Sequence, residues 1–328
     1  MDRHLPARLG PGAADTPKRI EVAFVRELKP ALPPPAARPP PPPRLSALAA
    51  MPAASSAAPP ALPLVPELAL VPEPALVALP LPLPLPPLQA LAEPAAGAAA
   101  TAEFDWPPST RLSYTLTGDF RGPVQGQAQV EWLRSGSRYQ VHLEVSVGPS
   151  FAPVLSRRIS SEGEITADGL QPRRYDETTQ IALRAPRRLT IWLDADRVRL
   201  PAGSDLVRPP GVQDSASQFV QMTWLFTTQP QLLQKGSTIE IALALPRRVE
   251  RWLYDVLDSE TLWTPAGAVE AVHVKPRREA GAGGDLTAEF WVAPSLQYLP
   301  VRILIRQDAS SYVDLLIERL PQQAERPR

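Results

Sequence analysis

Prolines are concentrated in one part of this chain and restrict what that part can fold into. Of the 43 prolines among 328 residues, 25 lie within residues 1–100. Proline has no amide hydrogen and a fixed φ, so a proline-rich stretch cannot complete a helix or a central strand. Such stretches favour extended polyproline structure, with a rise of about 3.1 Å per residue. We therefore predict that residues 1–103 form a disordered tether rich in proline and alanine.

A short segment of different character precedes the longest proline runs. In RIEVAFVRELKP (Arg19–Pro30), Ile20, Val22 and Phe24 alternate with other residues, which predicts an extended piece. The segment resembles the part of TonB-type energy transducers that follows the membrane anchor, where prolines then cross the periplasm. The resemblance implies an anchor before Lys18. We therefore expect a periplasmic protein, tethered to the inner membrane if such an anchor precedes Met1.

Composition disfavours several classes of function. The 34 basic and 34 acidic residues cancel, so the chain lacks the basic excess of a nucleic-acid-binding protein. Cysteine is absent, which excludes disulfides, thiolate metal ligands and cysteine nucleophiles. No run of about 18 apolar residues encodes a membrane-spanning helix. The three histidines, His4, His142 and His273, lack metal-ligand spacing, and we expect no metal, no cofactor and no enzymatic activity.

From residue 104 the pattern changes to an alternation of apolar and polar residues, which is typical of strands with one buried face. In RYQVHLEVSV, Tyr139, Val141 and Leu143 share one face while Gln140 and His142 share the other. Further strands are expected at Thr110–Thr117, Gln125–Leu133, Ser156–Ile165, Gln180–Arg184, Leu189–Leu193, 237–245, Val249–Leu257, Val269–Lys275, 286–293, 299–307 and Tyr312–Leu320. We predict a mainly β domain over residues 104–320, a curved antiparallel sheet or partly open barrel, followed by a disordered tail at 321–328.

One segment has the period of a helix instead. Within Asp214–Gly236, Phe219, Met222, Thr223 and Phe226 follow the spacing of a helical face. Asp214 or Ser215 can cap the start, and Pro230 divides the segment into a longer and a shorter helix. We expect this helical hairpin to fill the concave side of the sheet.

Four stretches resemble a family of bacterial envelope proteins, the domain-of-unknown-function family 3108 (DUF3108). They are ADGLQPRRYDE (Ala167–Glu177), QDSASQFVQMTWLF (Gln213–Phe226), LWTPAGAVEAVHVKP (Leu262–Pro276) and EFWVAPSLQYLPVRILI (Glu289–Ile305). The resemblance implies a partly open antiparallel β-barrel similar to the lipoprotein carriers of the periplasm. It implies no catalytic residues.

The tripeptide Pro-Arg-Arg occurs four times, and each copy is expected near a strand end. If these ends share one rim, their arginines form a band that binds phosphate or carboxylate groups. The residues of this expected anionic-ligand rim are Arg173, Arg174, Arg187, Arg188, Arg247, Arg248, Arg277 and Arg278. The alternative is that they are separate, solvated turns.

Two functions remain open at this point. One is a non-enzymatic envelope protein that binds a lipid, another amphipathic ligand or a partner protein in the concavity of its β domain. The other is a structural or energy-coupling adaptor, whose β domain is filled and docks onto another envelope protein. Fold resemblance alone cannot choose between them.

Overall fold

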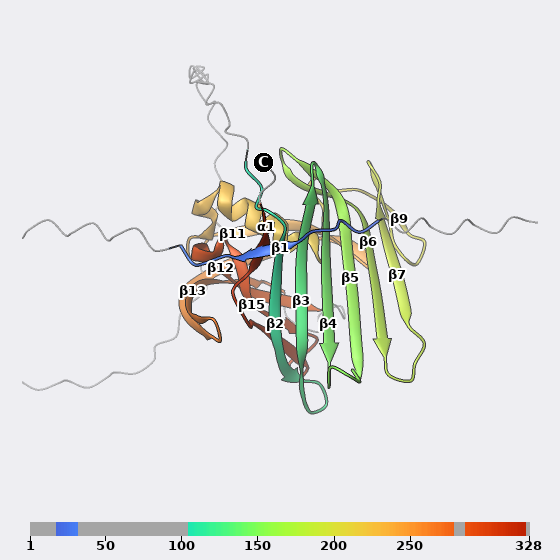
Figure 1. Ribbon diagram of the computed structural model, residues 1–328. Helices are drawn as coiled ribbons and strands as arrows, with labels where there is room; N and C mark the ends of the chain where they lie inside the picture. The colour runs from blue at the N-terminus through green and yellow to red at the C-terminus, as the bar shows by residue number, and fades with distance from the viewer. Residues whose placement is uncertain (1–17, 32–103, 279–285, 326–328) are drawn as a thin grey trace, which may run out of the picture. The chain divides into compact units, whose positions relative to one another are not determined.

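The computed structural model describes residues 18–31, 104–278 and 286–325, and the predicted proline-rich stretch at 32–103 lies outside them. Over the described residues the chain is mostly β structure, arranged as one large curved sheet whose edges do not pair (Figure 1). The predicted fold class is therefore confirmed. No helix in these three ranges is long and apolar enough to cross a membrane.

Antiparallel hairpins build most of the sheet. The strands are β1 (Phe24–Glu27), β2 (Thr110–Asp119), β3 (Pro123–Ser135), β4 (Arg138–Val147), β5 (Leu155–Thr166), β6 (Gly169–Ile181), β7 (Arg187–Leu193), β8 (Arg197–Arg199), β9 (Asp205–Val207), β10 (Gln213–Asp214), β11 (Thr238–Leu245), β12 (Arg248–Thr264), β13 (Gly267–Pro276), β14 (Thr287–Ala293), β15 (Leu299–Arg306), β16 (Tyr312–Ile317) and β17 (Gln322–Ala324). Sequential strands pair antiparallel from β2 to β9 and from β11 to β16. Strand β16 pairs with β2, which joins the two series, and β10 lies parallel to β11.

The alternation seen in the sequence decides which side chains enter the core. In β2, Leu112, Tyr114 and Leu116 are buried on the inner face, whereas Thr115 and Thr117 are exposed on the outer face. Burying such apolar side chains contributes roughly 1.5–3 kcal/mol each, which fixes the register of the strand.

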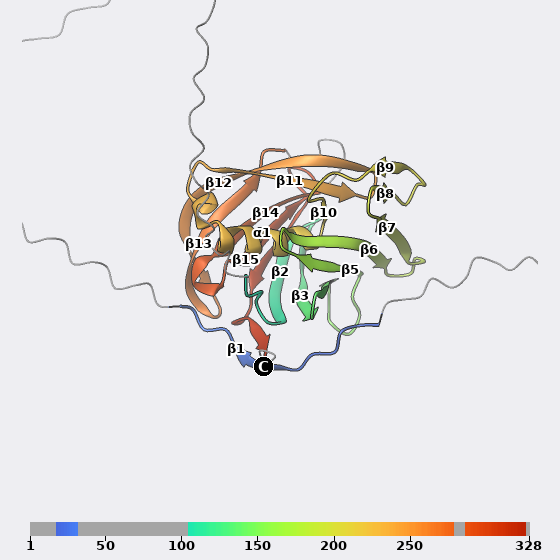
Figure 2. The ribbon, with the colours of Figure 1, turned by 90° about the horizontal axis from the view of Figure 1, so that it is seen from above.

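A helix fills the interior, as expected. Helix α1 (Ser217–Thr228) is followed by the short helix η1 (Pro230–Leu233), which begins at the predicted proline. Met222 and Phe226 are fully buried in one apolar cluster, and Val220 and Trp224 pack against a second cluster formed with strands β3 to β8. Seen from above, α1 lies within the ring that the sheet outlines (Figure 2). The helix therefore presents apolar side chains on two sides.

The domain boundaries differ from the prediction at both ends. Residues 18–31, predicted as tether, lie along the domain, where β1 pairs with β17 and the Ile20 amide donates to Gln140 Oε1 at 2.8 Å. Strand β17, predicted as disordered tail, pairs with both β1 and β2. The Arg19–Pro30 segment therefore belongs to the same domain as the strands from β2 onward. Local alternation could not reveal a pairing between strands about 300 residues apart.

Two smaller predictions about β6 are also wrong. The strand expected at Gln180–Arg184 is the end of β6 and an exposed loop. Pro172, expected at a strand end, lies inside β6, where the register shifts between Glu162 and Gly163 of β5. A bulge accommodates a residue that cannot donate to the ladder.

Side chains join β10 and α1 to strands β5 and β6, where no backbone ladder does. Leu170 near the start of β6 donates its amide to Gln221 Oε1 of α1 at 2.7 Å and accepts from Gln213 Nε2 of β10 at 2.9 Å. Asp214 of β10 accepts from Ser161 Oγ of β5 at 2.5 Å. Two glutamines therefore take the place of a neighbouring strand for Leu170.

Asp214 also fixes the start of α1. Its Oδ1 accepts the amides of Ala216 and Ser217, each at 2.9 Å, and its own amide donates to Ser217 Oγ at 2.9 Å. These bonds satisfy amides that the helix itself cannot pair, as the predicted cap would. The carboxyl group is fully buried, and burial raises the pKa of Asp214, although the bonds from Ser161, Ser217 and Ala216 oppose the rise.

Gly169→Ala tests the contact between β6 and α1. Gly169 has φ +104°, and a Cβ atom there would lie 2.3 Å from Gln221 Oε1. We expect a loss of about 2–4 kcal/mol in the free energy of unfolding, from backbone strain and displacement of Gln221. Gly267 ends a similar turn with φ +113° but has open space around it, so Gly267→Ala should cost only about 1–2 kcal/mol. Equal losses in urea unfolding would contradict the role of Gln221.

Asp214→Asn tests the cost of the buried carboxyl group. Because its folded pKa is raised, the stability it contributes is fully present below the unfolded pKa of about 4 and is lost as pH rises toward the folded value. Asparagine keeps an acceptor for the amides and a donor for Ser161 without a charge. We expect the variant to lose less stability than the original chain between about pH 4 and pH 7, measured by chemical unfolding.

Asp308→Asn is the matched control. Asp308 also accepts two amides, those of Ser310 and Ser311, but it is exposed and these bonds lower its pKa. The stability that its charge contributes is present above the unfolded pKa and is lost as pH falls. Asp308→Asn should therefore change the pH dependence of the free energy of unfolding in the direction opposite to Asp214→Asn. Identical slopes for the two variants would refute the assignment for Asp214.

Candidate functional site

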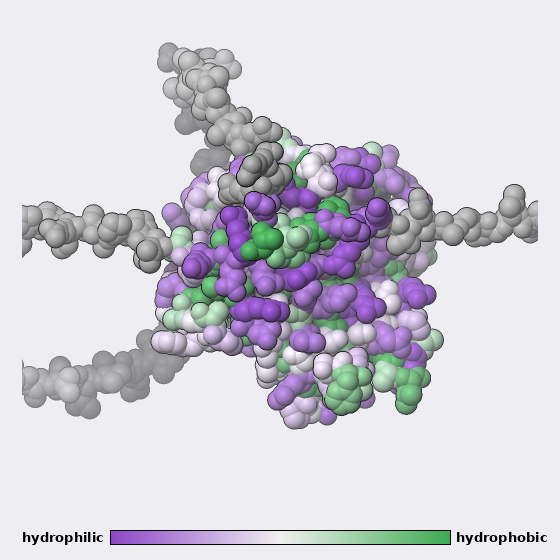
Figure 3. All heavy atoms as spheres, in the orientation of Figure 1, coloured by the Kyte–Doolittle hydropathy of each residue, from purple (hydrophilic) through white to green (hydrophobic). Residues whose placement is uncertain are grey.

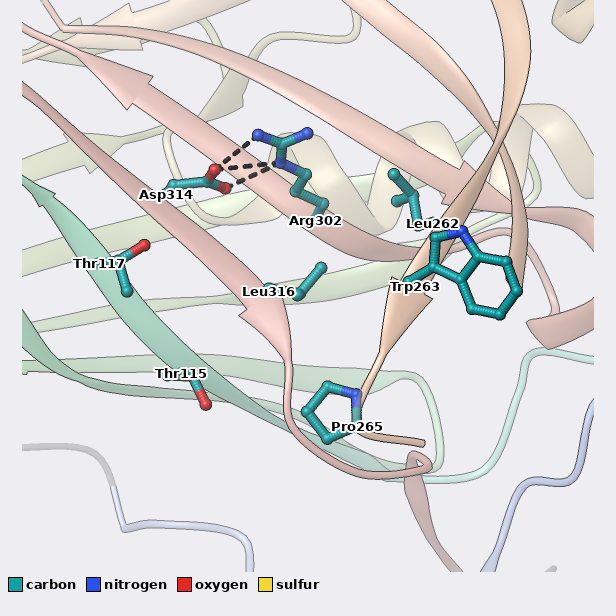
Figure 4. Close-up of a pocket in the computed structure, with 8 residues that line it drawn as sticks. All are labelled: Thr115, Thr117, Leu262, Trp263, Pro265, Arg302, Asp314 and Leu316. Atoms are coloured by element: carbon teal, nitrogen blue, oxygen red, sulfur yellow. Dashed lines mark hydrogen bonds and ion pairs between the residues drawn. The ribbon is translucent and has the colours of Figure 1, made fainter. Parts of the chain in front are cut away.

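A hollow on the outer face of the sheet lies beneath the end of the β12–β13 hairpin. Strand β13 pairs with β14 only from Val272 to Val274, yet it pairs with β12 as far as Gly267. Residues 259–271 therefore extend beyond the paired sheet as a two-stranded arm. Arm and sheet border a hollow of about 320 Å³. Its lining residues are Thr115, Thr117, Leu262, Trp263, Pro265, Arg302, Asp314 and Leu316 (Figure 4).

The strand pattern places the lining residues of the sheet. Leu116 and Leu315 are paired neighbours on the inner face, so Thr115, Thr117, Asp314 and Leu316 project from the outer face. In Figure 4, Leu316 lies in the middle of these residues, between the Arg302–Asp314 pair and Pro265. The floor is therefore apolar at its centre and polar around it.

Trp263 stands at the margin of the hollow. Its neighbour Leu262 is 7% exposed, whereas Trp263 is 80% exposed. Strand alternation on the arm turns Leu262 toward the core and Trp263 toward solvent. A large aromatic ring exposed to water is a common anchor for a binding partner, because burying it removes a large apolar surface from water at a small cost in side-chain entropy.

A stack of aromatic and charged groups supports the floor of the hollow. Trp291 of β14 is buried, with the ring of His273 stacked at 4.1 Å and 7°. The guanidinium carbon of Arg302 lies 4.5 Å from the Trp291 ring centroid. The indole nitrogen of Trp291 donates to Glu260 of the arm. Trp291 thus connects the sheet with the arm that forms the hollow.

The charges around this stack are paired. Arg302 donates Nε at 2.9 Å and Nη2 at 2.6 Å to the two oxygens of Asp314, and this bonding raises the pKa of Arg302. His273 Nε2 lies 3.0 Å from Glu289 Oε2. The hydrogen bond from His273, aided by the charges of Lys275, His273 and Arg306, lowers the pKa of Glu289 against the effect of burial. The site therefore presents dipoles and an aromatic face more than a net charge.

A second, more open hollow of about 780 Å³ continues from the first, sharing Thr115 and Thr117. Its remaining lining residues are Leu116, Pro123, Gln125, Gly126, Gln127, Gly148, Pro149 and Ser150. Together the two hollows form an elongated groove over β2 and β3, which we call the outer groove. Hydroxyl and amide side chains line part of the second hollow, but apolar atoms make up more of its surface, so a ligand there would meet both kinds of group.

The expected arginine rim is divided between different parts of the sheet. Arg173 and Arg174 lie in the first half of β6, while Arg187 and Arg188 are exposed where β7 begins, at the far end of the same hairpin. Arg247 lies in the turn between β11 and β12, next to Arg248.

Carboxylates lie close to most of these arginines. Arg173 pairs with Glu164 and Arg174 with Asp176. Arg248 and Arg278 both pair with Glu250, and Arg277 pairs with Asp255. The structure therefore brings Arg248 and Arg278 together but does not assemble the eight arginines into one band.

The residues of the outer groove were not singled out from the sequence. His273, which lacks metal-ligand spacing in the sequence, stacks on Trp291 and lies within hydrogen-bond distance of Glu289. A signal for the others was present, since Trp263, Trp291 and Arg302 lie within the two longer stretches that resemble the envelope family. What the sequence lacked was any sign that the arm folds back over β15 and β16.

Arg302→Lys tests the stack. Lysine cannot donate two bonds from a planar fork or stack in the same way on Trp291, so we expect a loss of about 1–2 kcal/mol in the free energy of unfolding. Arg277 also pairs with Asp255, through Nε at 2.9 Å from both carboxylate oxygens and Nη2 at 2.8 Å from Oδ1, but it is exposed. Arg277→Lys is therefore the control and should leave the midpoint of urea unfolding nearly unchanged. If both variants behaved alike, Trp291 stacking would contribute nothing.

Comparisons with solved structures find distant similarity. One is a β-barrel-like protein of the domain of unknown function DUF1849 from Brucella abortus, with 13% identity, a TM-score of 0.43, and coverage of 67% of this chain and 99% of that one. Another is a DUF1089-family protein from Pseudomonas aeruginosa, with 11% identity, a TM-score of 0.31, and coverage of 53% and 87%. No curated protein matches.

A family model gives a direct assignment. The model for DUF3108, described as a protein of unknown function, matches residues 112–316. These residues contain β3 to β15, nearly all of β2 and β16, helix α1, and the residues that line the two hollows. The resemblance to a TonB-type linker has no such support. The chain belongs to the DUF3108 family.

Proposed function

We propose that this chain is a non-enzymatic cell-envelope protein whose β domain binds an amphipathic ligand or partner segment in the outer groove. The main support for this proposal is that the Trp263 side chain is 80% exposed and lies beside the apolar Leu316 and the hydrogen-bonded Arg302–Asp314 pair. An amphipathic molecule would place its apolar part against Trp263 and Leu316. Its polar part would meet the hydroxyl and amide groups along β2 and β3.

The packed interior favours the outer face of the sheet, and not its concave side, as the place where a ligand binds. Met222 and Phe226 of α1 have no exposed surface, and Tyr254 and Phe290 are packed with them in the same apolar cluster. Phe219 meets Phe290 edge to face at 5.4 Å. A ligand in the concavity would have to displace these well-packed side chains, at a large cost in free energy.

The same filled interior favours the adaptor as the second candidate. In that case the β domain docks onto another envelope protein, and the outer groove carries no ligand. Periplasmic location and tethering to the inner membrane remain part of both proposals. They are supported by the resemblance of the chain to envelope proteins.

Trp263→Ala tests the ligand proposal. Full-length protein purified from envelope extracts should carry a small ligand visible by native mass spectrometry, and its rebinding should be at least about tenfold weaker in the variant. Trp192→Ala is the control, because Trp192 is also partly exposed but lies on β7, outside the groove. A ligand retained equally by both variants would refute the outer groove as its site. A ligand-free protein that captures an envelope protein would instead support the adaptor.

A further inference from the structure

Three hairpin loops at one end of the sheet form a continuous edge. They are residues 119–123 between β2 and β3, 148–154 between β4 and β5, and 181–188 between β6 and β7. The Gly148 amide donates to the Gln125 carbonyl at 2.8 Å, and the Ala182 amide donates to the Val154 carbonyl at 2.9 Å. The loops therefore lie side by side, at the lower end of the sheet in Figure 1. We call this set of loops the hairpin-end rim.

Large apolar side chains project into solvent along this rim. Phe151 is 89% exposed and Leu183 is fully exposed, at 105%. The other exposed apolar residues of the rim are Phe120, Val154 and Ile181. Figure 3 shows hydrophobic groups along the lower margin of the molecule, where these hairpins end. Single exposed apolar residues are ordinary on protein surfaces, but a group of them at one edge indicates a binding surface.

The backbone at Leu183 adds a second, independent observation. Its φ is +62°, in the left-handed region that disfavours every residue with a Cβ atom. This strained backbone presents an apolar side chain to water, so neither feature stabilises the fold. Backbone strain at a residue whose side chain does not pack within the fold is typical of a functional position.

The charge of the rim is positive. Arg121, Arg184, Arg187 and Arg188 are all exposed, and the loops contain one acidic residue, Asp119, whose carboxylate accepts the Gly122 amide at 3.1 Å. Arg187 and Arg188 are thus the part of the expected anionic-ligand rim that lies here.

The opposite end of the same hairpins lacks the basic excess of the rim. Its turns, at residues 135–138, 166–169 and 193–197, contain Asp168, Asp194 and Asp196 together with Arg138 and Arg197. Over the described ranges, none of the large exposed apolar residues lies in these three turns. The two ends of one sheet therefore differ in both charge and polarity.

We propose that the hairpin-end rim docks onto the surface of a bilayer that contains anionic lipids. The apolar side chains enter the boundary between headgroups and acyl chains, and the arginines contact lipid phosphates. The rim extends over the ends of six adjacent strands, about 24 Å at the usual strand spacing. Side chains on separate protruding loops suit a soft, flat interface better than the close-packed core of a protein interface. This proposal does not depend on the outer groove.

Vesicle flotation of the full chain tests the chemistry of docking. Binding should be strong on vesicles of phosphatidylglycerol and phosphatidylcholine and weak on phosphatidylcholine alone. Phe151→Ser with Leu183→Ser should weaken it on the order of 100-fold, and Arg184→Gln with Arg187→Gln roughly 30-fold, about fivefold for each arginine. The controls are Val207→Ser, which removes an exposed apolar side chain from β9, and Arg138→Gln with Arg197→Gln, which removes two charges elsewhere.

Because the substituted side chains are exposed, the variants should keep their fold, which circular dichroism can check. A change in vesicle binding then reports on the rim itself. Binding that the rim variants and the controls reduce equally would overturn the proposal. Binding that is the same with and without phosphatidylglycerol would also overturn it.

A fluorescent label tests the orientation. Since the chain contains no cysteine, a single Ala182→Cys can carry an environment-sensitive dye at the rim, and Ser137→Cys can carry it at the opposite end. Only the dye at residue 182 should shift to the blue when anionic vesicles are added. A shift at residue 137 alone would overturn the proposed orientation. If the dye at residue 182 shifted on raising the protein concentration without vesicles, the rim would bind a second copy of the chain, and the proposed docking onto a bilayer would be overturned.

Discussion

The sheet of this protein is held in its curved form by side chains that connect β10 and α1 with strands β5 and β6, which are far from β10 in the strand order. An open sheet leaves peptide groups without partners, and unpaired buried peptide groups are costly. Here Leu170 finds both partners in the glutamines Gln213 and Gln221, and Asp214 joins β5 through Ser161. Because Asp214 also binds the first amides of α1, the residue that joins β10 to β5 also positions the helix. The filled interior follows from that placement.

The four stretches that resemble the family meet in pairs. Ala167–Glu177 and Gln213–Phe226 supply the contact of β6 with β10 and α1. Leu262–Pro276 and Glu289–Ile305 supply the stack of His273, Trp291 and Arg302 beneath the arm. The first contact shapes the inside of the domain and the second shapes its outer face. The residues that carry the family resemblance therefore build two structural connections.

These two connections explain why the proposed interactions lie on the outside. With α1 packed against both apolar clusters, the concave side is occupied by side chains. The outer groove and the hairpin-end rim remain, and they share Pro123 and the segment from Gly148 to Ser150. A domain docked at its rim would hold one end of the groove close to the lipid headgroups. An amphipathic molecule would then reach Trp263 along the outer groove.

The sequence by itself determined the local structure of the domain. Alternation fixed the inner and outer faces of strands such as β2 and β4, the helical period fixed α1, and Pro230 marked where that helix ends. The tertiary structure decided what those faces meet. The pairing of β1 with β17, the return of the arm over Trp291 and the meeting of three loops at one rim join residues far apart in the chain. A local period reports that a side chain is buried or exposed, but it carries no information about its partner, so Trp263, Arg302 and Leu183 gained significance only from the folded arrangement.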